Sequence, residues 1–266
     1  MPTLADVVDL VHDWYPPDTA QSFDAVGLVS GDPGAEVARV MFAVDPTLEV
    51  AREAVEWGAD LLVVHHPLFL TPVSSVAATT PKGRTLKALT SGGCALLTAH
   101  TNADQAEGGV SESLALALGL RDLSPITPLA GAPSTGSGRI GTLDETTLDD
   151  FAAHVAGVLP RTAHGVRVAG DPARRVRRVA VCGGAGDFLL DELASSDVDV
   201  FVTSDLRHHR AGEFLEHGGP ALVDVAHWAA EWTWLPVVEG RLRAALDDRV
   251  ETRVSTRCTD PWQFRH

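Results

Sequence analysis

The chain contains 266 residues, of which 45% are hydrophobic, and its 36 acidic and 21 basic side chains give a formal net charge of −15. This size suits one large domain or two small ones. The excess of acidic residues argues against nucleic acid as a partner, because nucleic-acid-binding proteins normally show a basic face. The three widely spaced cysteines, without a CxxC motif, argue against a disulfide framework and a cysteine-based zinc site.

The N-terminal segment, MPTLADVVDLVHDWYPP, predicts an amphipathic helix that ends at Pro16 and Pro17. The segment lacks the basic start and the long apolar core of a signal peptide. No apolar run in the chain approaches the ~20 residues that a membrane span requires. The sequence therefore predicts a soluble, cytoplasmic protein without a membrane partner.

Strands and helices alternate in the first half of the chain. This rhythm is typical of an α/β unit with a mainly parallel sheet. The predicted strands are residues 37–44, 61–64 and 94–100, and the predicted helices are residues 46–60, 82–93 and 108–120.

Residues 122–138 are rich in Pro, Gly, Ser and Thr, which predicts a loop or linker. We therefore expect an N-terminal α/β domain over residues 1–128 and a second α/β domain over residues 129–266. The C-terminal segment is expected to pack back on the first domain.

The strand–helix rhythm resumes after this linker. Residues 139–159 predict a strand and a capped helix, and residues 177–193 predict a strand, a glycine turn and a helix. The remaining predicted elements are a strand at 198–205, a helix at 208–218, a strand at 220–226 and one long helix at 227–246.

Polar side chains collect where four predicted strands end, which is where open α/β sheets bind ligands. Imidazoles and carboxylates without thiolates suit Zn, Fe, Mn, Co or Ni. At least five of the residues at these strand ends are candidate ligands. A set of five ligands that includes two carboxylates suits two divalent metals ~3.5–4 Å apart. The residues at these ends are His65 and His66; His100 and Asp104; Asp205, His208 and His209; and Asp224, His227 and Glu231.

Two of these signals also have ordinary structural explanations. His227 and Glu231 lie one helical turn apart, which suits either a shared ion or a simple helix pair. Consecutive strand residues point to opposite faces, so His65 and His66 can serve one site only if the chain bends there. Pro67 favours such a bend, because it restricts the residue before it.

The segment HTNADQ allows several roles for its polar residues. Asp104 could be a metal ligand or a turn residue, since Asn and Asp are common in turns and helix caps. His100 could be a ligand, a partner of a ligand or a proton carrier. The segment VCGGAGD at 181–187 is a glycine turn that either cradles phosphate or simply allows close packing.

The sequence resembles the NIF-three-like dinuclear metal-centre proteins, also labelled GTP cyclohydrolase I type 2 homologues, over nearly the whole chain. Departures from the family pattern are Phe23, Ala25, Ser204 and Ala230, and none of them replaces a ligand. The segments that carry the resemblance are SFDAVGLVSGD, LLVVHHPLF, AHTNADQAEGGVSESLALALGL, VAVCGGAGDFLLDEL, DVDVFVTSDLRHH and DVAHWAAEW.

This resemblance implies two linked α/β domains of the NIF-three-like fold, with a two-metal site in the cleft between them, and a toroidal homo-hexamer. It implies a metal-dependent hydrolase that acts on a nucleotide or phosphoester, with His100 and His209 as residues for proton transfer. A non-enzymatic metal-binding scaffold or regulatory protein is the alternative. The ligands of the two divalent ions implied by the resemblance are His65, His66, Asp104, His227 and Glu231.

Overall fold

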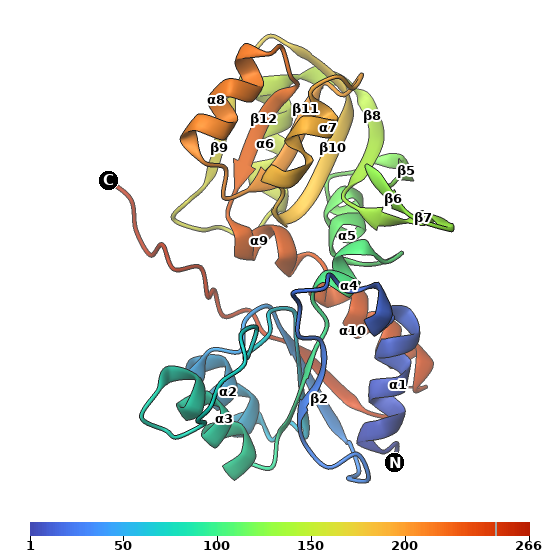
Figure 1. Ribbon diagram of the computed structural model, residues 1–266, viewed down its shortest axis with the longest axis vertical. Coiled ribbons are helices and arrows are strands. Elements are labelled where there is room, and N and C mark those ends of the chain that lie inside the picture. The colour runs from blue at the N-terminus through green and yellow to red at the C-terminus, as the bar shows by residue number, and fades with distance from the viewer. Residues whose placement is uncertain (248) are drawn as a thin grey trace. The chain divides into compact units, whose positions relative to one another are not determined.

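A computed structural model of the protein describes residues 1–247 and 249–266, and these divide into two compact units (Figure 1). Unit 1 comprises Met1–Ala103 and Leu235–Thr259, and unit 2 comprises Asp104–Trp234 and Asp260–His266. Each unit has a sheet of its own. The boundary expected near residue 128 falls within unit 2.

Unit 1 is built on a five-stranded sheet with the order β1-β4-β3-β2-β13. All neighbouring strands are parallel except β1, which is antiparallel to β4. β3 is apolar and fully buried, as expected of a central parallel strand that is covered on both faces. The strands are β1 (Gly27–Ser30), β2 (Arg39–Ala43), β3 (Leu61–Val64), β4 (Ala95–Thr98) and β13 (Glu251–Val254).

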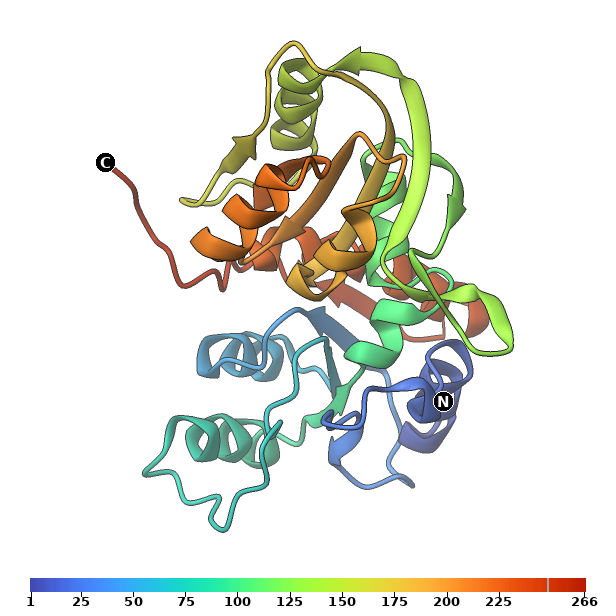
Figure 2. The ribbon, with the colours of Figure 1, turned by 45° about the horizontal axis from the view of Figure 1, so that its top comes forward.

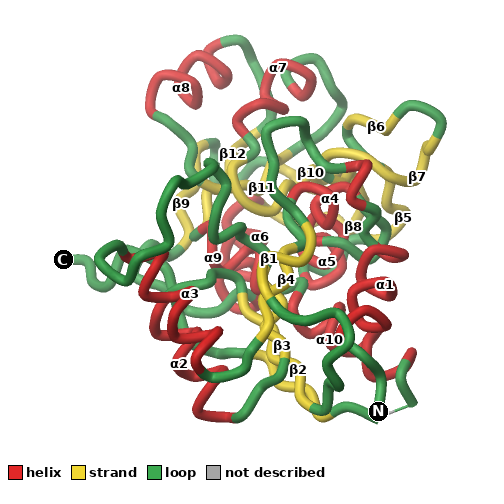
Figure 3. The backbone as a smooth tube through the Cα atoms, turned by 60° about the horizontal axis from the view of Figure 1, so that its bottom comes forward, coloured by secondary structure: helices red, strands yellow, loops and turns green. Residues whose placement is uncertain are grey.

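Helices cover both faces of this sheet, with α2 and α3 on one side and α1 and α10 on the other (Figure 3). The α2–α3 side packs a core that includes Met41, Leu62 and Leu89. α1 begins with a capping box of Thr3 and Asp6 and ends before the two prolines, as predicted. The helices are α1 (Leu4–Trp14), η1 (Pro17–Thr19), α2 (Leu48–Trp57), α3 (Pro81–Ser91) and α10 (Leu235–Ala245).

Unit 2 is built on a six-stranded mixed sheet with the order β5-β8-β10-β11-β12-β9. β10, β11 and β12 are parallel, whereas β5, β8 and β9 pair with their neighbours in antiparallel fashion. The expected mainly parallel arrangement is therefore confined to the centre of this sheet. The strands are β5 (Arg121–Ser124), β8 (Arg139–Thr147), β9 (Val166–Ala169), β10 (Arg175–Ala185), β11 (Val200–Ser204) and β12 (Ala221–Val225).

In unit 2, α7 and α8 lie on the near face of the sheet in Figure 2, where they bury Leu190, Leu193 and Phe214 in a shared core. α5, α6 and α9 also pack against the strands of this sheet. The division of the chain between Ala103 and Asp104 falls within α4 (Thr101–Gln105). The other helices are α5 (Val110–Ala117), α6 (Leu148–Val158), η2 (Asp187–Leu189), α7 (Leu190–Leu193), α8 (His208–Glu216) and α9 (His227–Trp232).

The prediction of a loop over residues 122–138 was wrong. Most of this segment forms β5, at the edge of the main sheet, and a two-stranded ribbon of β6 (Thr127–Leu129) and β7 (Ala132–Ser137). Its prolines and glycines are tolerated because these strands lie at edges and turns. Gly131 adopts a positive φ of 79° in the turn between β6 and β7.

The long helix predicted over residues 227–246 is in fact two helices, α9 and α10. Pro236 is the second residue of α10. Proline lacks the backbone N–H that a continuing helix would need, but it fits the first turn of a new one. This break also separates the units, since α9 belongs to unit 2 and α10 to unit 1.

Candidate metal centre

In unit 1, three polar groups follow neighbouring parallel strands. Asp45 lies just beyond β2, His65 directly follows β3, and His100 lies just beyond β4. Because β2, β3 and β4 are parallel, their carboxyl ends meet at one edge of the sheet. The fold of unit 1 therefore collects these side chains from segments that are far apart in the sequence.

Three imidazole rings converge at this edge. The ring centroids are 5.0 Å apart for His65 and His66, 5.0 Å for His65 and His100, and 5.5 Å for His66 and His100. One nitrogen from each ring lies within 4.8 Å of those of the other two, which is close enough for the three rings to share an ion. The bend required for His65 and His66 to share one side is therefore present. It begins where β3 ends, and the backbone N–H of His66 donates to the carbonyl of Val44 at 2.9 Å.

Hydrogen bonds fix which nitrogen of His65 and His66 carries the proton. The Nδ1 of His65 lies 2.9 Å from the carbonyl oxygen of Ala99, and the Nδ1 of His66 lies 2.7 Å from Oδ1 of Asp45. A carbonyl and a carboxylate can only accept, so Nδ1 carries the proton in both rings. The lone pair of each neutral imidazole is then on Nε2, which is the arrangement that histidine ligands of metals usually have.

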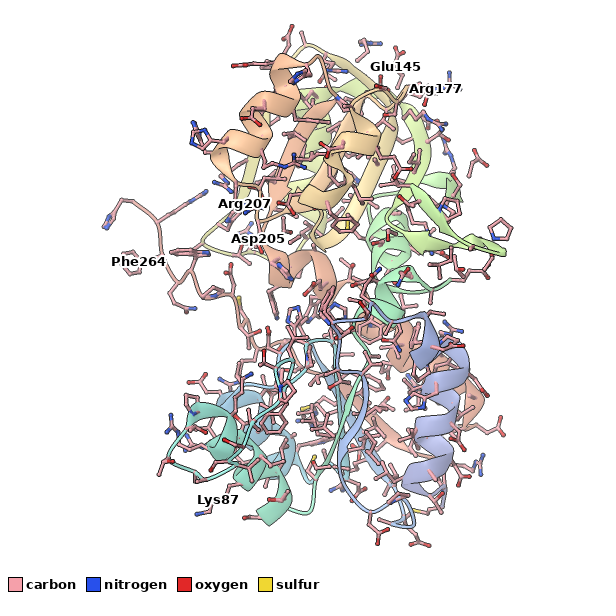
Figure 4. The ribbon with its side chains drawn as sticks, in the orientation of Figure 1. Lys87, Glu145, Arg177, Asp205, Arg207 and Phe264 are labelled. Atoms are coloured by element: carbon pink, nitrogen blue, oxygen red, sulfur yellow. The ribbon has the colours of Figure 1, made fainter. Side chains whose placement is uncertain are left out.

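In unit 2, the carboxyl ends of the parallel strands β10, β11 and β12 likewise share one edge. Gly184 lies at the end of β10, and Asp205 directly follows β11. His227 begins α9, which follows β12 after one residue. Figure 4 shows Asp205 on the loop after β11, at the end of the sheet where α9 lies.

His227 lies between two carboxylates of unit 2. Its Nδ1 is 2.7 Å from Oδ2 of Asp205, and its Nε2 is 2.8 Å from Oε1 of the buried Glu231, one helical turn along α9. The hydrogen bond from His227 lowers the pKa of Asp205 below its usual range. A neutral imidazole has one N–H, so one of these contacts then sets a lone pair against a carboxylate oxygen. A proton added to His227 or Glu231, or a cation bound by Nε2 and Oε1, relieves this repulsion, and the donors suit a divalent transition metal.

In unit 2, the carboxylates of Asp104 and Glu231 both act electrostatically on the thiol of Cys182. Burial raises the pKa of the Cys182 thiol, and the carboxylates of Asp104 and Glu231 raise it further. Cys182 therefore stays a neutral thiol and is a poor ligand, because metals bind the thiolate.

His209, the second residue expected to transfer protons, is exposed near the start of α8. Its ring packs near that of His208, with 5.2 Å between the centroids. The structure thus groups His100 with His65 and His66, but it gives His209 a surface position.

Sequence reasoning missed two carboxylates that orient imidazoles, Asp24 and Asp45. Asp45 was detectable in principle, because it follows a predicted strand as the other polar residues do. Asp24 lies before β1 in a loop and had no strand-end signal, but it stands in SFDAVGLVSGD, one of the segments that carry the family resemblance. Its partner is His100, whose Nδ1 is 2.8 Å from Oδ1 of Asp24.

The glycine turn at the end of β10 packs directly against the donors of α9. Gly184 has a positive φ of 70°. A Cβ added to it would lie 2.6 Å from Oε1 of Glu231 and 3.1 Å from Nε2 of His227. Both the backbone conformation and the close approach require glycine here. This supports the close-packing interpretation of the motif.

Replacing Gly184 with alanine is expected to weaken metal binding by about 10–100-fold, because the methyl group displaces the carboxylate of Glu231. The left-handed backbone should cost about a further 1–2 kcal/mol of unfolding free energy. Metal titration and denaturant unfolding of the purified variant measure the two effects.

The matched control is Gly157→Ala in α6, where an added Cβ meets nothing within 4 Å. It should leave metal affinity unchanged and stabilise the protein by about 0.8–1.0 kcal/mol. Equal metal affinity in both variants would contradict the role given to Gly184.

Comparison with known proteins places these features in a family. Residues 2–261 match Duf34/NIF3 (NGG1p interacting factor 3). The chain belongs to the Duf34/NIF3 family. A Streptomyces coelicolor protein named GTP cyclohydrolase 1 type 2 homolog is 47% identical, with 98% of this chain and 94% of the relative covered. A Clostridium perfringens protein of the same name is 30% identical, with 98% and 99% covered.

Solved structures extend the Duf34/NIF3 likeness to the whole fold. A hypothetical protein from Staphylococcus aureus matches with a TM-score of 0.90 at 28% identity, and the match covers 99% of both chains. A Bacillus cereus protein related to NIF3 also matches with a TM-score of 0.90, at 25% identity and 99% coverage of both chains. The fold class and the family resemblance predicted from the sequence are both confirmed.

The structure was also searched for helices that could cross a membrane. Within residues 1–247 and 249–266, none combines the length and the apolar character that such a helix needs.

Proposed function

We propose that His65, His66, Asp104, His227 and Glu231 bind two divalent transition-metal ions, and that the protein is a metal-dependent hydrolase. The observation that carries this proposal is the convergence of His65 and His66 in unit 1, where one nitrogen of each lies within 4.8 Å of the other and of a nitrogen of His100. The paired Nε2 of His227 and Oε1 of Glu231 in unit 2, 2.8 Å apart, add a second set of donors. Nitrogen and oxygen donors of this kind suit Zn, Fe, Mn, Co or Ni.

The substrate class proposed is a nucleotide or another phosphoester. Support comes from the names of the relatives, several of which are GTP cyclohydrolase 1 type 2 homologs. When bound, divalent metals would supply Lewis-acid activation of water and substrate.

Proton transfer is assigned to His100. Its Nδ1–H is held by Asp24, so Nε2 can accept a proton from an attacking water and return it to the leaving group. The exposed His209 is proposed as a second residue that exchanges protons with solvent.

The hydrolase is tested by assaying metal-loaded protein against nucleotides, phosphomonoesters and phosphodiesters, with detection of released phosphate and formate. We expect turnover that chelation abolishes and that His100→Gln lowers by about 10²–10⁴-fold, the usual contribution of a general acid–base. The exposed His154 of α6 offers a matched control, and His154→Gln should retain full activity.

The absence of turnover across the panel by a protein that binds metal would reject the hydrolase and favour the non-enzymatic scaffold or regulator. Turnover of equal rate by His100→Gln would reject the proton-transfer role of His100.

A further inference from the structure

The carboxylate of Asp24 is completely shielded from solvent and holds an imidazole at the edge of the unit 1 sheet. Its side chain is 0% exposed. Its Oδ1 lies 2.8 Å from Nδ1 of His100, and its Oδ2 accepts from the backbone N–H and the hydroxyl of Thr101 at 2.9 and 2.5 Å. A buried carboxylate is tolerated only where such donors compensate for the lost water.

These hydrogen bonds keep Asp24 ionised in its buried position. Burial by itself would raise the pKa of this carboxyl, but the hydrogen bonds from His100 and Thr101 outweigh burial and hold the pKa below its usual range. An ionised carboxylate can only accept hydrogen bonds, so the proton between Asp24 and His100 belongs to the imidazole.

The two loops that carry this pair are fastened to each other and to the rest of unit 1. The backbone N–H of Gln21 donates to the hydroxyl of Thr101 at 2.9 Å. The side chain of Asn102 accepts from the backbone N–H of His100 at 2.9 Å and donates to the carbonyl of Tyr15 at 2.7 Å. Neither loop can shift without breaking several of these hydrogen bonds.

We propose that Asp24 is a positioning residue, which holds His100 in the Nδ1–H tautomer and turns its Nε2 lone pair towards His65 and His66. The Asp45–His66 pair differs, because its side chains are 27% and 25% exposed and water can take the place of the carboxylate. The site of Asp24 is closed to water. Asp24 therefore decides alone whether His100 presents a lone pair or an N–H. The catalytic consequence rests on the proposed function, but the tautomer does not.

The tautomer of His100 is measured directly by long-range ¹H–¹⁵N correlation of the imidazole nitrogens in uniformly ¹⁵N-labelled, metal-free protein. His100→Gln assigns the resonances. In the unchanged protein we expect the Nδ1–H tautomer. In Asp24→Asn, the amide can offer its NH₂ group to Nδ1, and we expect a shift to the Nε2–H tautomer or to a mixture of both.

The control is Asp18→Asn, at an exposed position nearby in the chain, which should leave the His100 resonances unchanged. An Nε2–H tautomer in the unchanged protein overturns the proposal, and this measurement does not require that Asp24→Asn folds. An unaltered Nδ1–H tautomer in folded Asp24→Asn overturns it as well.

A second measurement tests the catalytic consequence. If the protein turns over a substrate, Asp24→Asn should lower kcat by about 10²–10⁴-fold while metal content and KM stay close to those of the unchanged protein, because only the proton carrier is affected. An unchanged kcat overturns the consequence for catalysis. A protein without any activity refutes the proposed function instead, and the tautomer measurement still decides the role of Asp24.

Discussion

Replacing Glu231 with glutamine is expected to lower the affinity for divalent transition metals by more than about 100-fold. Loss of a group that merely supports a ligand typically costs 10–100-fold, and this change removes the charge of a donor itself. Glutamine keeps the size of the buried side chain, which is 2% exposed, so the fold of α9 should be preserved. The loss therefore reports on the metal rather than on packing.

The effect of Glu231→Gln is measured by competition with a chromophoric chelator and by elemental analysis of the metal bound per chain. The exposed Glu216 of α8 provides the control, since Glu216→Gln removes an equal charge from the same unit. If Glu231→Gln retained two tightly bound ions, the ligand set proposed for this protein would be wrong.

Replacing Arg139 with methionine is expected to lower the unfolding free energy by about 3–5 kcal/mol, the usual cost of breaking a buried ion pair from one side. Arg139 begins β8 and is 1% exposed. Its guanidinium donates at 2.8 Å to the carbonyls of Gly136, Gly138 and Ala106, and it pairs with Glu112 at 3.3 Å. Methionine leaves all of these acceptors without the donor.

The loss of Arg139 should also weaken metal binding. The guanidinium holds the carbonyls of Gln105 and Ala106, at the end of the helical turn that carries Asp104. Without it, that turn loses its attachment to β8, and the carboxylate of Asp104 is no longer fixed.

Denaturant unfolding of the metal-free protein measures the stability change of Arg139→Met. Arg175 on β10 is the control, because it pairs with Glu145 on the surface, where their side chains are 66% and 51% exposed. Such exposed pairs contribute at most about 1 kcal/mol, so Arg175→Met should cost no more than this. Similar losses of unfolding free energy in the two variants would contradict the stabilising role given to the buried guanidinium of Arg139.

Much of the fold could be predicted because its signals are local. β3 was predicted from LLVV alone, and α1 from its amphipathic pattern and the prolines that follow it. The prediction failed at residues 122–138, where a composition typical of loops forms edge strands. It also failed at residues 227–246, where a single proline divides the predicted helix. At residues 122–138 the outcome depends on the strands with which the segment pairs. At residues 227–246 the prediction overlooked the local effect of Pro236 on a continuing helix.

In the candidate site, too, some features follow from local sequence patterns and others depend on tertiary contacts. The sequence by itself determined the candidate donors, because imidazoles and carboxylates at strand ends are read directly from residue types and strand patterns. The bend that brings His65 and His66 together, and the tautomers of their rings, were decided by the tertiary structure. So was the pairing of Asp24 with His100, which are 76 residues apart. The physical reason is that a hydrogen bond that orients a ring depends on the position of an acceptor from another strand or loop, and local sequence patterns carry no information about that position.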